Sequence, residues 1–389
     1  MNEKLRNIGN HYLASGGGNT ICEIFQQPEM WIKTAEIVAS QHDQIRKFIE
    51  IITREPDHII ILTGAGSSDY VGRASHVSLN PFFHHRIRSV STTDIVASPR
   101  DLLSPNRPTL LVSFARSGNS PESVATIEAA DSICEKVRHL VITCNSEGHL
   151  AKLGKSRTDF YSIILPAETN DKGFAMTSSF TCMYLAALLA FSSRDSLEVM
   201  LNNLQAVSMA TIRVLNDFEE IERIVSDYFF ERIVYLGSGV LKGIANESAL
   251  KMLELTRGKV ATLSDSALGF RHGPKSFLND KTLIILYLSA DLSTYRYEMD
   301  LLKELSAERR GNKIVAVTNH SAPDLEKYVD FLINAELPMV NSHMIALVNV
   351  VIAQLLAFFK SLKLGLAPDN PFPDGEVNRV VKGVTIYPI

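Results

Sequence analysis

The chain contains two halves that repeat short apolar segments in the same order. The segment ILTGAGSS, with Gly64, has a counterpart in VYLGSG, with Gly237, 173 residues later. TLLVSF from Thr109 matches TLIILY from Thr282 at the same offset, and LVITCN matches IVAVTN at an offset of 174. Each segment is rich in Leu, Ile and Val, ends at Gly, Ser or Asn, and precedes a helix-like stretch. The repeat therefore predicts a duplicated α/β protein with two similar domains.

The same segments predict the type of sheet. A strand that is buried on both faces reads as a continuous apolar run, and all six segments do so. We expect a parallel sheet covered by helices in each half. The expected parts of the chain are an N-terminal helical extension, a first domain, a second domain and a C-terminal tail, at residues 1–57, 58–200, 201–367 and 368–389.

Composition and charge exclude several classes of partner. The net charge of −4 gives no electrostatic reason to expect binding to nucleic acid or to an anionic membrane. The most apolar helix is expected at residues 344–359, and its 16 residues, which include Asn349 and Gln354, predict that it is too short and too polar to span a bilayer. The four cysteines form no CxxC pair and the first residues contain no apolar signal core. We expect a soluble cytoplasmic protein.

Glycine and serine gather where two first-half strands are expected to end. The loops are residues 64–68 (GAGSS) and 115–120 (ARSGNS). Backbone N–H groups at a helix start, together with Ser hydroxyls, can bind a phosphate at the carboxyl ends of parallel strands. Tight turns and helix caps explain either loop alone, but two such loops on neighbouring strands favour a phosphate site. Asp69 stands where a dinucleotide motif needs its third Gly, and no GxxxxGK[ST] motif occurs.

Candidate acid–base residues occur in the second half. Glu247, Lys251 and Glu254 have helical spacing and share one face of the helix expected after Gly237. Such a pattern is often a solvated stripe of salt bridges, but the start of this helix lies where a ligand would bind. His272, in the sequence FRHGP, is either a capped surface histidine or a positioned acid–base group. No HExxH motif or His/Cys cluster occurs, so we expect no metal.

Motifs in both halves resemble those of a known family. TGAGSS, SFARSGNSPES and LVITCN resemble the sugar isomerase (SIS) domain, and ESALKMLEL followed by GFRHGP resembles, more distantly, the isomerase half of glucosamine-6-phosphate synthase. With KGFAMTSS and VNRVVKGVTIYP, the whole set is similar to bacterial galactosamine-6-phosphate deaminase/isomerases, formerly described as tagatose-6-phosphate ketose/aldose isomerases. The resemblance implies two tandem flavodoxin-like SIS domains, a C-terminal tail that packs at the active site, and a homo-oligomer such as a homodimer.

The resemblance also implies roles for individual residues. The residues implied to bind substrate, most of them at its phosphate, are Ser68, Arg116, Ser117, Gly118, Ser120 and Glu247. The residues implied in catalysis are Lys251, Glu254, His272 and Lys382. Among these, Glu254 would be the base that moves a proton between C1 and C2. His272 would open the sugar ring, from its own subunit or from a neighbouring one.

The function implied by the resemblance is conversion of galactosamine 6-phosphate to tagatose 6-phosphate and ammonia through an enolamine. Proton transfer and stabilisation of the intermediate need no metal or other cofactor. One alternative is aldose–ketose isomerisation of a sugar phosphate, tagatose 6-phosphate, without loss of nitrogen, which would use the same Glu254 and His272. The other is a non-catalytic phosphosugar sensor, which is disfavoured by that intact pair and by the lack of a basic recognition helix in residues 1–57.

Overall fold

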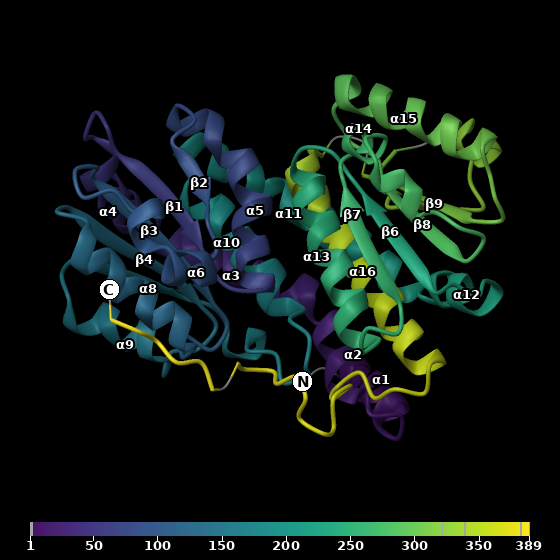
Figure 1. The fold of residues 1–389 in the computed structure, drawn as a ribbon, viewed down its shortest axis with the longest axis horizontal. Helices are drawn as coiled ribbons and strands as arrows, with labels where there is room; N and C mark the ends of the chain where they lie inside the picture. The colour runs from purple at the N-terminus through teal and green to yellow at the C-terminus, as the bar shows by residue number, and fades with distance from the viewer. Residues whose placement is uncertain (1–2, 321, 338–339, 382, 389) are drawn as a thin grey trace. The chain divides into compact units, whose positions relative to one another are not determined.

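The chain folds into two compact units, each built on one five-stranded sheet (Figure 1). The structure is a computed structural model and describes residues 3–320, 322–337, 340–381 and 383–388. The first-sheet unit comprises Glu29–Asp171, Ser178–Leu201 and the tail from Gly375 onward. The second-sheet unit comprises the chain up to Pro28, Lys172–Thr177 and Asn202–Asp374. The helices in residues 1–57 are therefore shared between the two units.

The first sheet is entirely parallel, in the order β2-β1-β3-β4-β5. Its strands are β1 (Ile59–Thr63), β2 (Ile87–Ser89), β3 (Thr109–Ala115), β4 (Val137–Thr143) and β5 (Phe160–Ile164). The helices of this part of the chain are α3 (Gln27–Ser40), α4 (His42–Thr53), α5 (Ser67–Leu79), α6 (Thr92–Ala97), α7 (Pro99–Leu102), α8 (Pro121–Ile133), α9 (His149–Ser156) and α10 (Ser178–Ala190).

The second sheet repeats this topology. Its order is β10-β9-β8-β6-β7, which, read from β7, matches β2-β1-β3-β4-β5 strand for strand. Its strands are β6 (Arg232–Leu236), β7 (Ala261–Asp265), β8 (Thr282–Tyr287), β9 (Lys313–Thr318) and β10 (Phe331–Asn334). The remaining helices are α1 (Glu3–Leu13), α2 (Gly18–Phe25), α11 (Arg194–Asn216), α12 (Glu219–Asp227), α13 (Val240–Leu255), α14 (Ala267–Phe270), α15 (Leu292–Ala307) and α16 (Ser342–Lys363). The order is that of flavodoxin-like folds, so the predicted fold class is confirmed.

Central strands are buried on both faces, as the sequence predicts. Ile61 and Leu111 pack in a cluster that includes Ile95 of α6, Ile127 of α8 and Leu150 of α9. The alternating residues of the same strands point to the other face of the sheet. All of β1 and β3 is nevertheless buried. Helices must therefore cover both faces of this sheet.

The turn from the first central strand into its helix is the same in both halves. Gly66 before α5 has φ 57° and ψ −128°, and Gly239 before α13 has φ 59° and ψ −126°. Residues with a Cβ rarely adopt this conformation, which favours Gly at both positions. Two residues earlier, a Cβ on Gly64 or Gly237 would lie 2.5 Å from the backbone of the following helix. The shared turn supports the duplication inferred from the sequence.

Helix α16 differs from its prediction. It has 22 residues, not 16, and among the described residues it is the one helix long and apolar enough to cross a membrane. The prediction from length was therefore wrong. Because 94% of its most apolar window is buried inside the structure, α16 is the core helix of the second-sheet unit and does not indicate a membrane protein.

Candidate active site

The predicted phosphate residues come from the loops that follow two neighbouring strands. β1 and β3 pair in parallel, with Thr63 beside Ser113, so their carboxyl ends lie at the same edge of the first sheet. The strand order reverses between them, and this switch point is where open α/β sheets bind ligands. Ser68 follows β1, and the other predicted contacts follow β3: Ser117, Gly118 and Ser120. The fold thus gathers these residues at one switch point.

The loop after β3 combines a turn with a helix cap. Gly118 has φ 66°, and the Ser117 hydroxyl accepts a hydrogen bond from the Asn119 amide at 3.3 Å. The Ser120 hydroxyl caps α8 by accepting from the Ser123 amide at 3.3 Å. Both serines are partly exposed, so they stabilise the turn and also face solvent beside the start of α8. That arrangement suits an anion.

Arg116, at the start of this loop, contacts the C-terminal tail. Its side chain is buried, and Nη2 donates to the carbonyl oxygen of Arg379 at 2.8 Å. The Arg379 guanidinium in turn donates to the carbonyl oxygen of Asp171. The guanidinium of Arg116 therefore ties the tail to the loop after β3, and a contact with substrate phosphate stays a prediction. Lys382, also predicted in this tail, lies outside the described residues.

The three charged residues of α13 form a largely buried group. Lys251 Nζ lies 3.5 Å from Glu247 Oε1 and donates a hydrogen bond to Glu254. The Glu247 and Lys251 side chains are 0% and 1% exposed, whereas Glu254 is 27% exposed. The interpretation as a solvated stripe is therefore wrong. Burying an ion pair carries a large desolvation cost, so the pair is better explained by a function than by stability.

His272 lies in a turn that is held on both sides. Ser266 caps the short helix α14, and Gly273, with φ 116°, follows the histidine directly. Glu304 of α15 accepts from Arg271 Nε at 2.7 Å and from Lys275, the residues that flank His272 and its turn. His272 itself is exposed. Sequence inspection missed Glu304, because an acidic residue on an amphipathic helix gives no signal of a distant partner.

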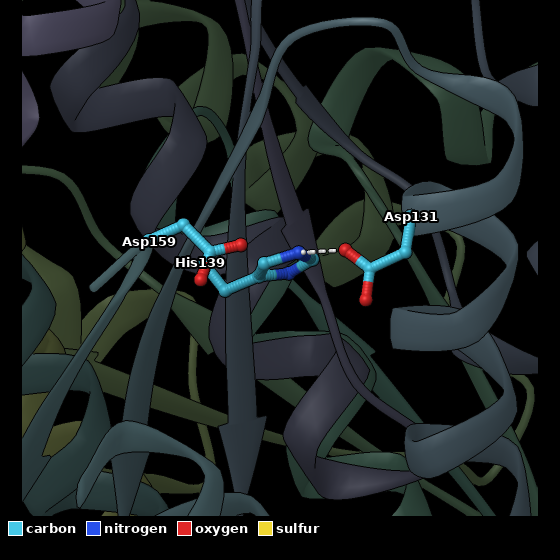
Figure 2. A group of neighbouring side chains, drawn as sticks. All are labelled: Asp131, His139 and Asp159. Carbon is cyan, nitrogen blue, oxygen red and sulfur yellow. Dashed lines mark hydrogen bonds and ion pairs between the residues drawn. The ribbon is translucent and has the colours of Figure 1, made fainter. Parts of the chain in front are cut away.

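A different group, at the opposite edge of the first sheet, offers three possible metal ligands. Figure 2 shows Asp131, His139 and Asp159, whose candidate ligand atoms lie within 4.8 Å of one another. Arg157 pairs with Asp131 at 2.6 Å and with Asp159 at 2.5 Å, and His139 Nε2 lies 2.8 Å from Asp131 Oδ1. Burial alone would raise the pKa of Asp131, but His139 and Arg157 outweigh it and lower that pKa to about 2. Arg157 supplies the positive charge here, so the group is a structural ion-pair cluster.

Comparison with known proteins places this geometry in a family. The SIS domain matches residues 230–359. D-galactosamine-6-phosphate deaminase AgaS from Shewanella sp. is 42% identical, with 95% of this chain and 92% of the relative aligned. A solved structure from Clostridium novyi NT is 42% identical and has a TM-score of 0.94 over 98% of this chain and 97% of that one.

The structure of tagatose-6-phosphate ketose/aldose isomerase from Escherichia coli is similar as well. It is 36% identical, with a TM-score of 0.87 over 96% of this chain and 98% of that one. Relatives at this identity align with nearly the whole chain, so the similarity covers both units and every predicted site residue that the structure describes. The chain belongs to the AgaS family of SIS-domain proteins.

Proposed function

We propose that this chain is a sugar-phosphate deaminase/isomerase that converts galactosamine 6-phosphate to tagatose 6-phosphate and ammonia. The observation that carries the proposal is the buried Glu247–Lys251 pair beside the partly exposed Glu254. A carboxylate that is held by a buried lysine and still reaches solvent is suited to act as a general base on a bound substrate. The Shewanella relative bears the name of this deaminase.

The first-sheet loops would hold the phosphate. The hydroxyls of Ser68, Ser117 and Ser120 can donate to phosphate oxygens, and the amides at the start of α8 add aligned donors. Gly118, at φ 66°, lets the backbone approach the ligand without a Cβ in the way. Arg116 would add positive charge nearby while it holds the tail.

The second-sheet residues would carry out the proton transfers. His272 opens the sugar ring, and Glu254 removes the proton from C2 of the open-chain amino aldose to give an enolamine. Return of a proton to C1 gives a ketimine at C2. Water adds to this ketimine, and its breakdown releases one ammonia and leaves the C2 carbonyl of the ketose. Lys251 fixes the orientation of Glu254 through its hydrogen bond, and Glu247 holds Lys251 in turn. Lys382 remains a predicted catalytic residue.

We further propose a soluble cytoplasmic homo-oligomer, such as a homodimer, that acts on a small phosphosugar without a metal or other cofactor and without nucleic acid or membrane partners. The chemistry needs only proton transfer and addition of water, which supports the absence of a cofactor. Burial of α16 supports the soluble form.

Ammonia release from galactosamine 6-phosphate tests the proposal, with glucosamine 6-phosphate measured in parallel. We expect rapid release from the galacto sugar and slower release from the gluco sugar. If neither sugar releases ammonia, the deaminase proposal fails. Interconversion of tagatose 6-phosphate with its aldose would then identify an isomerase that does not remove nitrogen, the activity named for the Escherichia coli structure.

A further inference from the structure

The second sheet has its own switch point, between β6 and β8. The strand order reverses there as it does between β1 and β3. The loop after β6 contains Ser238 and leads into α13, and the loop after β8 contains Ser289 and leads into α15. These loops are the counterparts of the two phosphate loops of the first sheet. By topology, an anion is therefore expected here too.

A carboxylate of the protein itself occupies this position. Glu298 of α15 is fully buried, and its Oε2 accepts a hydrogen bond from the Ser289 amide at 2.7 Å. The amide and hydroxyl of Ser238 also hydrogen-bond to it. Burial raises the pKa of Glu298 to about 7, and the bonds from both serines oppose that rise by favouring the charged form. One side chain thus joins the loops after β6 and β8.

The first half has no equivalent acid. The corresponding turn of α8, residues 124–127, reads VATI. In the first sheet, the amides of the loops therefore meet no carboxylate from this helix. The two switch points differ in the source of the anion: the first would take it from the ligand, and the second takes it from α15.

The position of Glu298 matters because α13 begins at Val240, directly after Ser238 and Gly239. A carboxylate at this end of a helix satisfies its free N–H groups and interacts favourably with the helix dipole. Any shift at the start of this rigid helix moves Glu247, Lys251 and Glu254 with it.

We propose that Glu298 is an internal anion that fills the switch point of the second sheet and positions the start of α13, the helix of the acid–base residues. It is a positioning residue and does not contact substrate. The part of this proposal that concerns turnover rests on the proposed function. The anion site itself does not.

The test compares Glu298→Ala with Asp300→Ala, which removes an exposed acid from the same helix. We expect Glu298→Ala to lower kcat about tenfold or more, because small misplacements of catalytic groups are costly, while KM changes little. Sodium formate, which can enter the vacated site, should restore part of the kcat. It should also raise the melting temperature of Glu298→Ala above that measured in sodium chloride of equal ionic strength, and should do neither for Asp300→Ala.

Several results would overturn the proposal. One is a folded Glu298→Ala variant with wild-type kcat, and another is a variant whose kcat and melting temperature respond to formate no more than those of Asp300→Ala. If Glu298→Ala does not fold, Glu298→Gln keeps the shape and removes the charge. We expect a lower kcat at unchanged KM, and a wild-type kcat for this variant would contradict the proposal. If the wild type releases no ammonia, the proposed function fails, but the melting temperatures in formate still test the anion site.

Discussion

Helices α5 and α13 begin in the same way and carry different chemistry. Each follows a central strand and starts after a glycine of nearly identical φ and ψ. At positions 173 residues apart, however, α5 has Ala74 where α13 has Glu247, and Ser78 where α13 has Lys251. The duplicated scaffold stayed the same, and substitutions on one buried helix face placed charges only in the second half.

The two switch points show the same division. The first has loops with serines that face solvent, and the second is filled by the buried Glu298. We therefore expect changes at the first switch point to act mainly on KM and changes around α13 to act mainly on kcat. The following predictions test that separation, from the largest expected effect to the smallest.

Lys251→Met should destabilise the protein by about 3–5 kcal/mol, because it leaves the buried Glu247 without its cation. The double variant Glu247→Gln/Lys251→Met should recover most of that stability and remain inactive. Denaturant unfolding of both variants and the wild type measures the effect. A single variant as stable as the wild type would show that the ion pair is not what distinguishes α13 from α5.

Glu298 should make stability depend on pH. Its pKa rises from 4.5 to about 7 on folding, chiefly through burial, with a smaller contribution from Asp291. The native state thus keeps a proton that the unfolded state has lost. The free energy of unfolding should fall by up to about 3 kcal/mol as the pH rises from about 4.5 to 7, and should then level off. Glu298→Gln should lack this fall, so parallel pH profiles for the two proteins would contradict the assignment. The neighbouring Tyr295 does not titrate in this range, because burial raises its pKa above 10.

Gly66→Ala and Gly239→Ala form a matched pair across the two halves. A Cβ at either position meets no atom within 4 Å, so the cost is only that of the backbone conformation, about 1–3 kcal/mol in each case. Thermal unfolding should show similar losses of stability. Kinetics should differ: Gly66→Ala should raise KM, and Gly239→Ala should lower kcat. The same kinetic effect from both would remove the proposed separation.

Ser117→Ala should raise KM about tenfold with little change in kcat, the loss expected for one hydrogen bond to a charged phosphate. Ser146→Ala, in the loop after β4, is the control, because it lies one strand away from the switch point. Steady-state kinetics on galactosamine 6-phosphate measures both variants. Equal KM values for the two variants would exclude Ser117 from the phosphate site.

Sequence patterns revealed the centre of each sheet and missed its edges. The six predicted strands are β1, β3, β4, β6, β8 and β9, and the structure has ten. The four missed strands, β2, β5, β7 and β10, all lie at sheet edges. Edge strands are short and partly exposed, so they lack the continuous apolar run that marks a strand buried on both faces.

The site was predictable to a similar degree. Motifs and helical spacing located the Ser-Gly loops and the face of Glu247, Lys251 and Glu254. They could not show that this face is buried, because spacing alone does not distinguish a buried ion pair from a solvated one. They also missed Glu298, which lies among the charged residues Asp300, Lys303 and Glu304 and becomes distinct only when its burial is known.

The most direct test of the account is to measure substrate binding and turnover of Glu254→Gln together. We predict that ammonia release falls about 10²–10⁴-fold, as expected for loss of a general base. Calorimetry should still give a dissociation constant for galactosamine 6-phosphate close to the wild-type KM, because the phosphate loops are untouched. Ammonia release at the wild-type rate would contradict the assignment of α13 as the catalytic helix.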